Sequence, residues 1–320
     1  MKVFLILIIL LITYRPAFSA TDLIFLIESA YKNNPKLKAE RENLKAIKEN
    51  INISKSDFLP SVTITGSIDS SESTNRTDQS GNSLADISNE TETTSVSVDQ
   101  KIFQGFEGYN SVKKSKLEVK RASFQLKKIE QEVILETATA YYDLEYKIKS
   151  KDFNLNNVDL FERQVESDKA RSQKGEISLT DLSQSESSLA GAFADFIAAE
   201  NDLLTAKTNF ERITRISVPD QIDENLKYDI LLPKNLNDSL QLSEKNNPDL
   251  IIAKLNYEIS KKDVNIEKAK LSPSASLNYS RSSNDDFSAT VDELEKESVK
   301  ATITWPLLKG GKNFSSLKKA

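Results

Sequence analysis

Apolar residues recur every seven positions through the middle of the chain, between residues 106 and 216. The recurring positions are Val112, Val119, Leu126, Val133 and Ala140 on a first arm, and Leu182, Leu189, Phe196, Leu203 and Phe210 on a second arm. A heptad stripe packs along a partner helix, so this pattern predicts a long helical hairpin over residues 106–216. A soluble antiparallel bundle would show the same stripe. The second arm, however, would extend roughly 60 Å at about 1.5 Å per residue, which favours an extended coiled coil.

The two arms are separated by a short segment with the residues of a turn and a helix cap. Lys174-Gly175 marks the turn, because glycine commonly follows the last residue of a helix. Ser178 or Thr180 would cap the second arm, and Asp181 would lie near its positive end. Structurally these residues are a turn and a cap. Functionally, the tip of a long exposed hairpin is a place where another protein can dock.

A second pattern is an internal repeat. Asn33-Asn34-Pro35 recurs as Asn246-Asn247-Pro248, and each copy is followed by four apolar positions seven residues apart and then by a proline. The apolar positions are Leu37, Leu44, Ile51 and Phe58 in the first copy and Leu250, Tyr257, Val264 and Leu271 in the second. The chain therefore divides into a first structural repeat at 20–233, with a linker at 217–233, and an incomplete second repeat at 234–320.

After each of these prolines the period changes from seven to two, which predicts strands. We expect one strand pair at 61–69 and 94–102 and another at 274–281 and 298–305, joined by polar loops at about 70–93 and 282–297. A soluble hairpin with one face on a core would show the same alternation. Strands of this length also fit a tilted membrane-spanning strand, and Tyr279 and Trp305 suit a membrane interface.

The apolar positions of these strands define one face. We expect that face to contact lipid through Val62, Ile64, Val96, Val98, Leu277, Tyr279, Ile303 and Trp305. The alternating polar positions, among them Thr63, Thr65, Ser97 and Lys101, would then line the other side.

The first 19 residues have the composition of a secretory signal peptide. Lys2 precedes an apolar run from Val3 to Ile12, and Ala17-Phe18-Ser19 provides a small-residue cleavage site. An uncleaved anchor is the alternative, but the run is about ten residues and a helical span needs about 20.

Composition removes most catalytic functions. The chain has no cysteine and no histidine, so thiolate nucleophiles, imidazole bases and the usual zinc ligands are absent. We therefore expect no catalytic, cofactor-binding or metal-binding site. With 48 acidic and 43 basic side chains the net charge is −5, which disfavours nucleic-acid binding.

In their order, these elements resemble the TolC-like outer-membrane efflux family (outer membrane factors). The resemblance rests on the duplicated Asn-Pro motif, the strand ends Phe103-Gln104-Gly105 and Leu308-Lys309-Gly310, and the tip at 175–181. It implies a mainly α fold in which long antiparallel coiled-coil helices form an α-barrel. Four strands per subunit would contribute to a 12-stranded β-barrel in a homotrimer. The location would be the Gram-negative outer membrane and its lipid, extending into the periplasm.

The same resemblance implies the partners. The family's hairpin tip contacts a periplasmic adaptor (membrane fusion) protein, which joins the channel to an inner-membrane transporter. Here that tip corresponds to Lys174, Gly175, Glu176, Ile177, Ser178, Thr180 and Asp181. Glu176 departs from the family, where an apolar residue is common.

We therefore expect an outer-membrane channel subunit of a tripartite efflux or type I secretion system, acting as a passive exit duct, in a chain truncated in its second repeat. A coiled-coil structural or adhesive protein of the cell surface is the main alternative. It would explain the heptads but not the strand pairs that interrupt them at the same place in both copies. A periplasmic binding module should contain more than 8% aromatic residues, and a diffusion porin needs more strands per chain.

Overall fold

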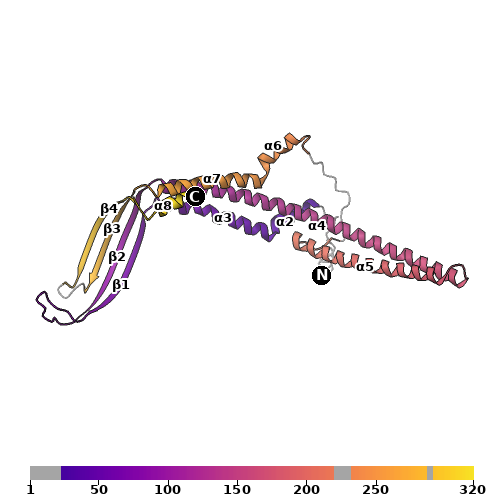
Figure 1. Cartoon of the computed structure of the whole chain (residues 1–320), viewed down its shortest axis with the longest axis horizontal. Helices are drawn as coiled ribbons and strands as arrows, with labels where there is room; N and C mark the ends of the chain where they lie inside the picture. The colour runs from indigo at the N-terminus through magenta and orange to yellow at the C-terminus, as the bar shows by residue number, and fades with distance from the viewer. Residues whose placement is uncertain (1–22, 220–231, 287–290) are drawn as a thin grey trace, which may run out of the picture. The chain divides into compact units, whose positions relative to one another are not determined.

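The computed structural model describes residues 23–219, 232–286 and 291–320. The signal peptide expected at 1–19 and most of the linker expected at 217–233 lie outside these residues. The fold class is confirmed: long antiparallel helices accompany four antiparallel strands (Figure 1). In chain order the elements are α2 (Leu23–Asn33), α3 (Pro35–Ser56), β1 (Ser61–Ser73), β2 (Ile87–Gln104), α4 (Glu107–Gln173), α5 (Leu179–Thr214), α6 (Leu236–Asn246), α7 (Pro248–Ala269), β3 (Ser274–Asp285), β4 (Leu294–Thr304) and α8 (Lys312–Lys319).

The chain forms two compact units that do not coincide with the two sequence repeats. One unit contains the described residues up to Glu42 together with Leu126–Leu242, and the other contains Asn43–Gln125 and Ser243–Ala320. Each unit contains residues of both repeats, and the boundaries between the units fall within α3 and α4. The repeats therefore describe the order of elements along the chain, whereas the units describe how the elements pack.

The 67-residue helix α4 is possible because no proline occurs in it and no glycine occurs after Gly108. At about 1.5 Å per residue it extends roughly 100 Å. Such a helix is stabilised mainly by side-chain packing along its length, so the apolar stripe matters more than helix propensity. Within the described residues, no helix combines the length and the hydropathy needed to cross a membrane.

In the first unit, α2, α4 and α5 share an apolar core. Leu26, Tyr141, Leu144 and Phe210 are fully buried there, and Leu203 and Ala206 join them. A second cluster brings Ala30 and Leu37 against Val133 of α4. Of the heptad positions expected on the two arms, Val133, Leu203 and Phe210 take part in these clusters, and the alanines at 192, 199 and 206 are buried as well.

The duplicated Asn-Pro motif starts a helix in both copies. In the second copy the side chain of Asn247 accepts hydrogen bonds from the backbone N–H groups of Asp249 and Leu250, and Pro248 is the first helical residue. In the first copy Asn34 Oδ1 accepts from the N–H of Lys36 at 2.8 Å. Asparagine satisfies N–H groups that have no partner within the helix, and proline at the first position has no such group to satisfy.

The heptad stripe of the second copy does not pack as the first does. Leu37 is fully buried, but Leu250 and Tyr257 in α7 are exposed, and α7 instead buries Leu255 and Ile259. The reason is a different partner face: α7 lies along the first part of α4, where Asp263 pairs with Lys114 at 2.7 Å and Asn256 accepts from Arg121.

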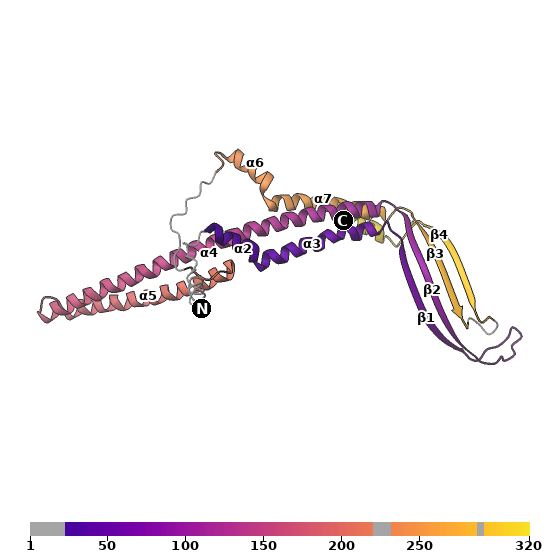
Figure 2. The same ribbon diagram turned by 180° about the vertical axis from the view of Figure 1, so that it is seen from behind.

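The four strands form one antiparallel sheet in the order β1-β2-β3-β4 (Figure 2). Its register aligns one apolar row across all strands, Val62–Val98–Tyr279–Val299, and the adjacent row, Thr63–Ser97–Ser280–Ser298, is entirely polar. Because neighbouring rows of a sheet point to opposite faces, the sheet has one apolar and one polar face near these rows. The sheet thus joins both copies of the repeat.

The strands are longer than their alternation predicts. β1 continues to Ser73 and β2 begins at Ile87, so both ends of the expected loop at about 70–93 are strand and the connection shortens to residues 74–86. In the second pair, β3 continues to Asp285 and β4 begins at Leu294, while Trp305 lies just beyond the end of β4. Hydrogen bonding between strand backbones needs no apolar side chains, so the ladder continues through Ser, Thr and Glu after the apolar alternation ends.

Replacing Phe210 by alanine should destabilise the protein by about 3–5 kcal/mol, because a large aromatic side chain is removed from a filled core. Denaturant unfolding of the purified protein, followed by circular dichroism, measures this change. Lys207→Ala, at an exposed position of the same helix, should change stability by no more than about 0.5 kcal/mol. Equal losses in the two variants would contradict a core at the α2–α4–α5 contact.

Candidate functional site

The hairpin tip begins with a complete helix-terminating motif. Gly175 has a positive φ of 77°, its N–H donates to the carbonyl of Ser172 at 2.9 Å, and the N–H of Glu176 donates to the carbonyl of Arg171 at 2.9 Å. This pair of hydrogen bonds closes the end of α4 around a left-handed residue, a conformation that glycine adopts without steric cost. The turn is therefore specified by Gly175.

Helix α5 begins with a reciprocal cap. Ser178 Oγ accepts from the N–H of Asp181 at 3.2 Å, and Asp181 Oδ2 accepts from the N–H of Ser178 at 3.0 Å. Of the two capping candidates in the sequence, the structure uses Ser178, and Thr180 lies in the first turn. The Ser178 hydroxyl also donates to Asp181 Oδ2 at 2.7 Å, and this bond, together with that from the N–H of Ser178, lowers the pKa of Asp181. The negative charge near the helix N-terminus adds to the stability of the cap.

A hydrogen-bonded aspartate links the two arms next to the tip. Asp168 of α4 accepts from Ser185 of α5 at 2.6 Å and from Gln164 at 2.8 Å, and its side chain is only 8% exposed. The hydrogen bonds from Ser185 and Gln164, with the nearby charge of Arg171, lower the pKa of Asp168. Asp168 therefore stays ionised in a nearly buried position because hydrogen bonds compensate its lost hydration.

Asp168 and Ser185 were not singled out from the sequence. A signal was present, since Asp168 follows the buried Val158 and Val165 at the 7 and 3 spacing of a coiled-coil seam. A charged residue in such a seam needs a partner on the facing helix. Ser185 supplies it.

The outer surface of the tip combines charge with one exposed apolar side chain. Leu179 is 76% exposed, and Ile177 beside it is half-buried. Glu176, the departure from the resembled family, lies 3.5 Å from Arg171. The other expected tip residues, Lys174, Gly175, Ser178, Thr180 and Asp181, are exposed. The structure thus brings all seven together on an ordered turn with a small apolar contact point.

The second candidate surface is the apolar face of the sheet. Val62, Ile64, Ile303 and Trp305 are all more than 60% exposed, Leu277 is exposed to 40%, and Val96, Val98 and Tyr279 are half-buried. Trp305 directs its indole N–H to the carbonyl of Leu271 at 3.2 Å, so its polar group has a partner. An exposed apolar surface of this size is a contact surface for another molecule or a membrane.

The apolar face ends at a charged row. Ile64 and Val96 are aligned with Arg281 and Glu297 of the second strand pair. Arg281 pairs with Glu295 at 3.2 Å, and the Tyr279 hydroxyl donates to Glu297 at 2.9 Å. The apolar band is consequently wider on the first strand pair than on the second.

A tight backbone contact joins the two copies at the foot of the sheet. Gly105 has a φ of 58°, and a Cβ atom there would lie 2.5 Å from both the carbonyl oxygen of Ala269 and the Cβ of Ser272. Glycine is therefore required twice, for the backbone conformation and for the close approach. The matching residue of the second copy, Gly310, has a φ of 55° with nothing within 4 Å of the corresponding position.

One acidic group could attract a cation. Carboxylate oxygens of Asp285, Asp286 and Asp292 lie within 4.8 Å of one another, and all three residues are exposed. The charge of Asp285 raises the pKa of Asp286, which shows mutual repulsion within the group. Exposure leaves these carboxylates hydrated, so the geometry alone does not assign a metal site.

Comparison with known proteins identifies similar sequences and folds. The family model described as "Outer membrane efflux protein" matches residues 26–214. The outer membrane efflux protein BepC of Brucella suis is 25% identical over 292 residues, which cover 91% of this chain and 61% of that protein. The outer membrane protein TolC of Vibrio cholerae is 24% identical over 322 residues, covering 96% of this chain and 70% of that protein.

Among solved structures, the Campylobacter jejuni CmeC outer membrane channel has the same fold. It matches with a TM-score of 0.73 at 15% identity, over 93% of this chain and 64% of that chain. The present chain therefore spans about three fifths of the length of BepC and about two thirds of that of CmeC.

Acid should destabilise the hairpin partly through Asp168. Because its folded-state pKa lies below the ordinary value of 3.8, its stabilising effect is complete above that value and is lost as the pH falls through the folded-state pKa. The Tm of Asp168→Asn should be lower than that of the wild type at neutral pH, and the gap should narrow on acidification. Thermal unfolding of both proteins from neutral pH down to acidic pH measures this gap in Tm, and Asp152→Asn, at an exposed position, is the control. A gap that stays constant with pH would show that ionisation of Asp168 is irrelevant.

Proposed function

The chain belongs to the outer membrane efflux protein family, and from this membership we propose that it is a channel subunit of a tripartite efflux or type I secretion system. Its location is the outer membrane. The subunit provides a passive exit duct that continues from the outer membrane into the periplasm. Among the relatives named above, BepC is an outer membrane efflux protein and CmeC an outer membrane channel, and the duct requires no catalytic chemistry.

One observation carries this proposal: a two-faced, four-stranded sheet with two open edges is joined to the 67-residue helix α4. In lipid, unpaired backbone groups at a strand edge are too costly to persist. Four strands are too few to close on themselves, since the smallest common barrels have about eight. Several copies must therefore contribute strands, and we propose the homotrimer of twelve strands that the family resemblance implies. The apolar face then contacts lipid and the polar face lines the duct.

The repeat supplies a register for the contact between subunits. Within one chain β2 pairs with β3, which joins the first copy to the second, and Asp99 lies opposite Asn278. Alignment of the strand ends at Gly105 and Gly310 makes Asp99 correspond to Thr304. Alignment of the two Asn-Pro motifs makes Asn278 correspond to Thr65. We propose that β4 of one subunit pairs with β1 of the next, with Thr304 opposite Thr65.

The glycine contact supports the same arrangement. Gly105 lies against the turn at Ala269–Ser272, where the N–H of Ser272 donates to the carbonyl of Ala269. An equivalent turn exists in the first copy, where the N–H of Leu59 donates to the carbonyl of Ser56. Gly310 has the backbone conformation of Gly105 and open space around it, so this turn of a neighbouring subunit would fit against Gly310 as Ala269–Ser272 fits against Gly105.

The hairpin tip is the proposed docking site for a periplasmic adaptor protein, which joins the channel to an inner-membrane transporter. Two features support this role. The turn is fixed at both ends, by Gly175 and by the Ser178–Asp181 cap, so its ordering costs little on binding. Leu179 offers an exposed apolar contact between charged neighbours.

A charge on the apolar face should prevent assembly in the membrane. Ile64→Arg places a guanidinium toward lipid and should cost roughly 2–4 kcal/mol near the bilayer midplane, which lowers the yield of the membrane-inserted oligomer. The oligomer can be quantified by gel electrophoresis without heating. Thr65→Arg, the neighbouring residue on the polar face, is the matched control and should assemble. The reverse outcome would mean that the two faces are exchanged.

Disulfide cross-linking tests the contact between subunits directly. The chain has no cysteine, so Thr65→Cys combined with Thr304→Cys introduces one defined pair. Residues directly opposite in an antiparallel pair have Cα atoms about 4.5–5.5 Å apart, within the range of a disulfide. Mild oxidation should produce covalent trimers that dissociate on reduction, and these trimers should conduct ions in planar bilayers.

Thr65→Cys combined with Thr302→Cys is the control, since it cross-links efficiently only if the register is shifted by two residues. Efficient cross-linking of this pair alone would reject the proposed register. If neither pair forms a bond between chains, the pairing of β4 with β1 is wrong. Cross-linked trimers without conductance would reject the channel.

A further inference from the structure

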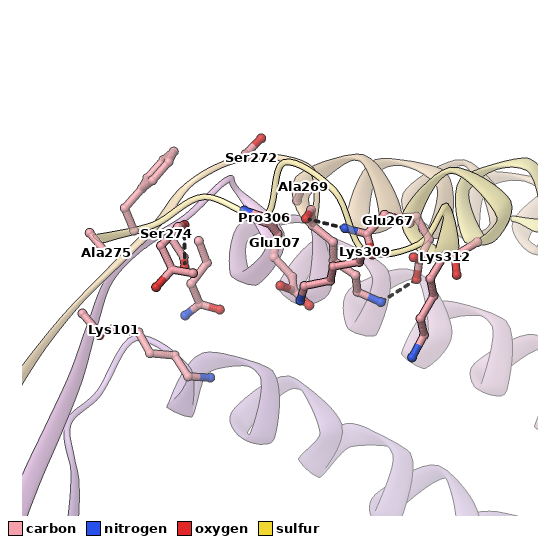
Figure 3. A pocket seen from close by; sticks show the side chains of 17 residues that line it. Lys101, Glu107, Glu267, Ala269, Ser272, Ser274, Ala275, Pro306, Lys309 and Lys312 are labelled. Atoms are coloured by element: carbon pink, nitrogen blue, oxygen red, sulfur yellow. Dashed lines mark hydrogen bonds and ion pairs between the residues drawn. The ribbon is translucent and has the colours of Figure 1, made fainter. Parts of the chain in front are cut away.

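A pocket of about 570 Å³ lies where the sheet meets the helices (Figure 3). It is surrounded by the C-terminal ends of β2 and β4, the N-terminal end of β3, the last turn of α7 and the first turns of α4 and α8. Its volume is within the range of roughly 300–1,000 Å³ that is usual for small-molecule sites. All of its lining residues belong to the same compact unit.

Among the charged residues of the lining, cations outnumber anions. Four lysines, Lys101, Lys270, Lys309 and Lys312, face two carboxylates, Glu107 and Glu267. Figure 3 shows Lys309 and Lys312 on the side of the helices and Lys101 on the side of the strands. A concave surface with an excess of positive charge raises the local concentration of anions.

The lysines differ in whether the charge of the side chain is paired with a carboxylate. Lys101 pairs with Asp57 at 2.7 Å and Lys270 with Glu267 at 2.5 Å. Within the described residues, the side chains of Lys309 and Lys312 have no ion pair or hydrogen bond. These two ammonium groups are therefore available to a ligand.

Neutral donors accompany the two lysines. The pocket includes Ser276, Ser316 and Asn313, the last in the first turn of α8. The N–H of Lys312 donates to the carbonyl of Lys309 at 3.0 Å, and the N-cap Gly311 has no side chain to accept from the N–H groups that follow. Such N–H groups and the positive helix end favour a negatively charged ligand.

The pocket lies on the polar face of the sheet. Its strand residues Lys101, Ser276 and Thr304 alternate with apolar neighbours that point to the opposite face, such as Leu277 and Ile303. This position separates the pocket from the proposed lipid-contacting face. A free anion is therefore a better match than a lipid headgroup.

The positive charge is specific to the second copy. At the positions that correspond to Lys309 and Lys312, the first copy has Gln104 and Glu107. Both copies nevertheless form the same pair of left-handed residues at this turn, Gly105–Phe106 and Gly310–Gly311. The lysines are thus not needed to build the turn.

We propose that this pocket binds multivalent anions that carry phosphate or carboxylate groups, with Lys309 and Lys312 as the principal contacts. Binding itself does not require a closed channel. If the proposed function holds, the pocket faces the duct and provides a binding position for anionic cargo.

Isothermal titration calorimetry of the purified protein with inorganic pyrophosphate tests this proposal. The wild type should bind, and Lys309→Gln combined with Lys312→Gln should weaken binding by roughly tenfold or more, because two charge-assisted contacts are lost. Lys318→Gln combined with Lys319→Gln removes the same amount of charge from the end of α8, outside the pocket, and should leave the affinity within about twofold. Lys309→Arg combined with Lys312→Arg keeps the charge and should retain binding, which separates a lost contact from a folding defect.

The proposal is overturned if the wild type does not bind pyrophosphate, or if both glutamine pairs weaken binding equally. Vesicles of phosphatidylglycerol provide the lipid comparison. The wild type and the Lys309/Lys312 glutamine variant should bind them equally, and a loss confined to vesicle binding would reject a free anion as the ligand. Because calorimetry needs no assembled barrel, cross-linked trimers without conductance would reject the channel and leave this inference standing.

Discussion

The hydrogen bonds of the sheet edge constrain this protein more than any other interaction. β1 and β4 are paired on one side only, whereas β2 and β3 are paired on both. Each open edge carries a row of backbone donors and acceptors that need partners, most of all where water is excluded. The exposed apolar row beside Val62 and the open space at Gly310 lie at these same outer strands and their ends. In the proposed oligomer a neighbouring copy would pair the open edges and fill the space at Gly310, and lipid would cover the apolar row.

The helical part depends on a different principle. The arms are held by a narrow seam in which small and large apolar residues alternate, and polar pairs fix the ends of that seam. At one end Asp168 and Ser185 align the arms, and near the other Ser29 donates to the carbonyl of Thr214. Directional bonds at specific points prevent the sliding that a uniform heptad seam would allow. The tip can therefore present its surface in a defined orientation relative to the two arms.

Periodicity was sufficient to predict the elements and their order. A helix or strand that packs on one face has apolar residues at regular spacing, which can be read directly from the sequence. The heptads between Val112 and Phe210 and the alternation around Val62 and Val98 are of this kind. The strand ends were missed because backbone pairing continues past Ser70 without an apolar signal. The buried face of α7 was missed because Leu255 and Ile259 are selected by α4, a partner distant in sequence. The pocket was missed for the same reason, since Lys101 and Lys312 meet only after the sheet has formed.

The contact at Gly105 has a consequence for how a ring of such subunits would assemble. In the proposed trimer every strand pair meets the next through the same joint, and half of these joints lie within a single chain. A joint within a chain forms at a high effective concentration and is independent of how much protein is present. A joint between chains requires an encounter. Duplication of the repeat within one polypeptide therefore halves the number of encounters that depend on concentration, so a ring built from duplicated chains can close at protein levels too low for single-repeat subunits.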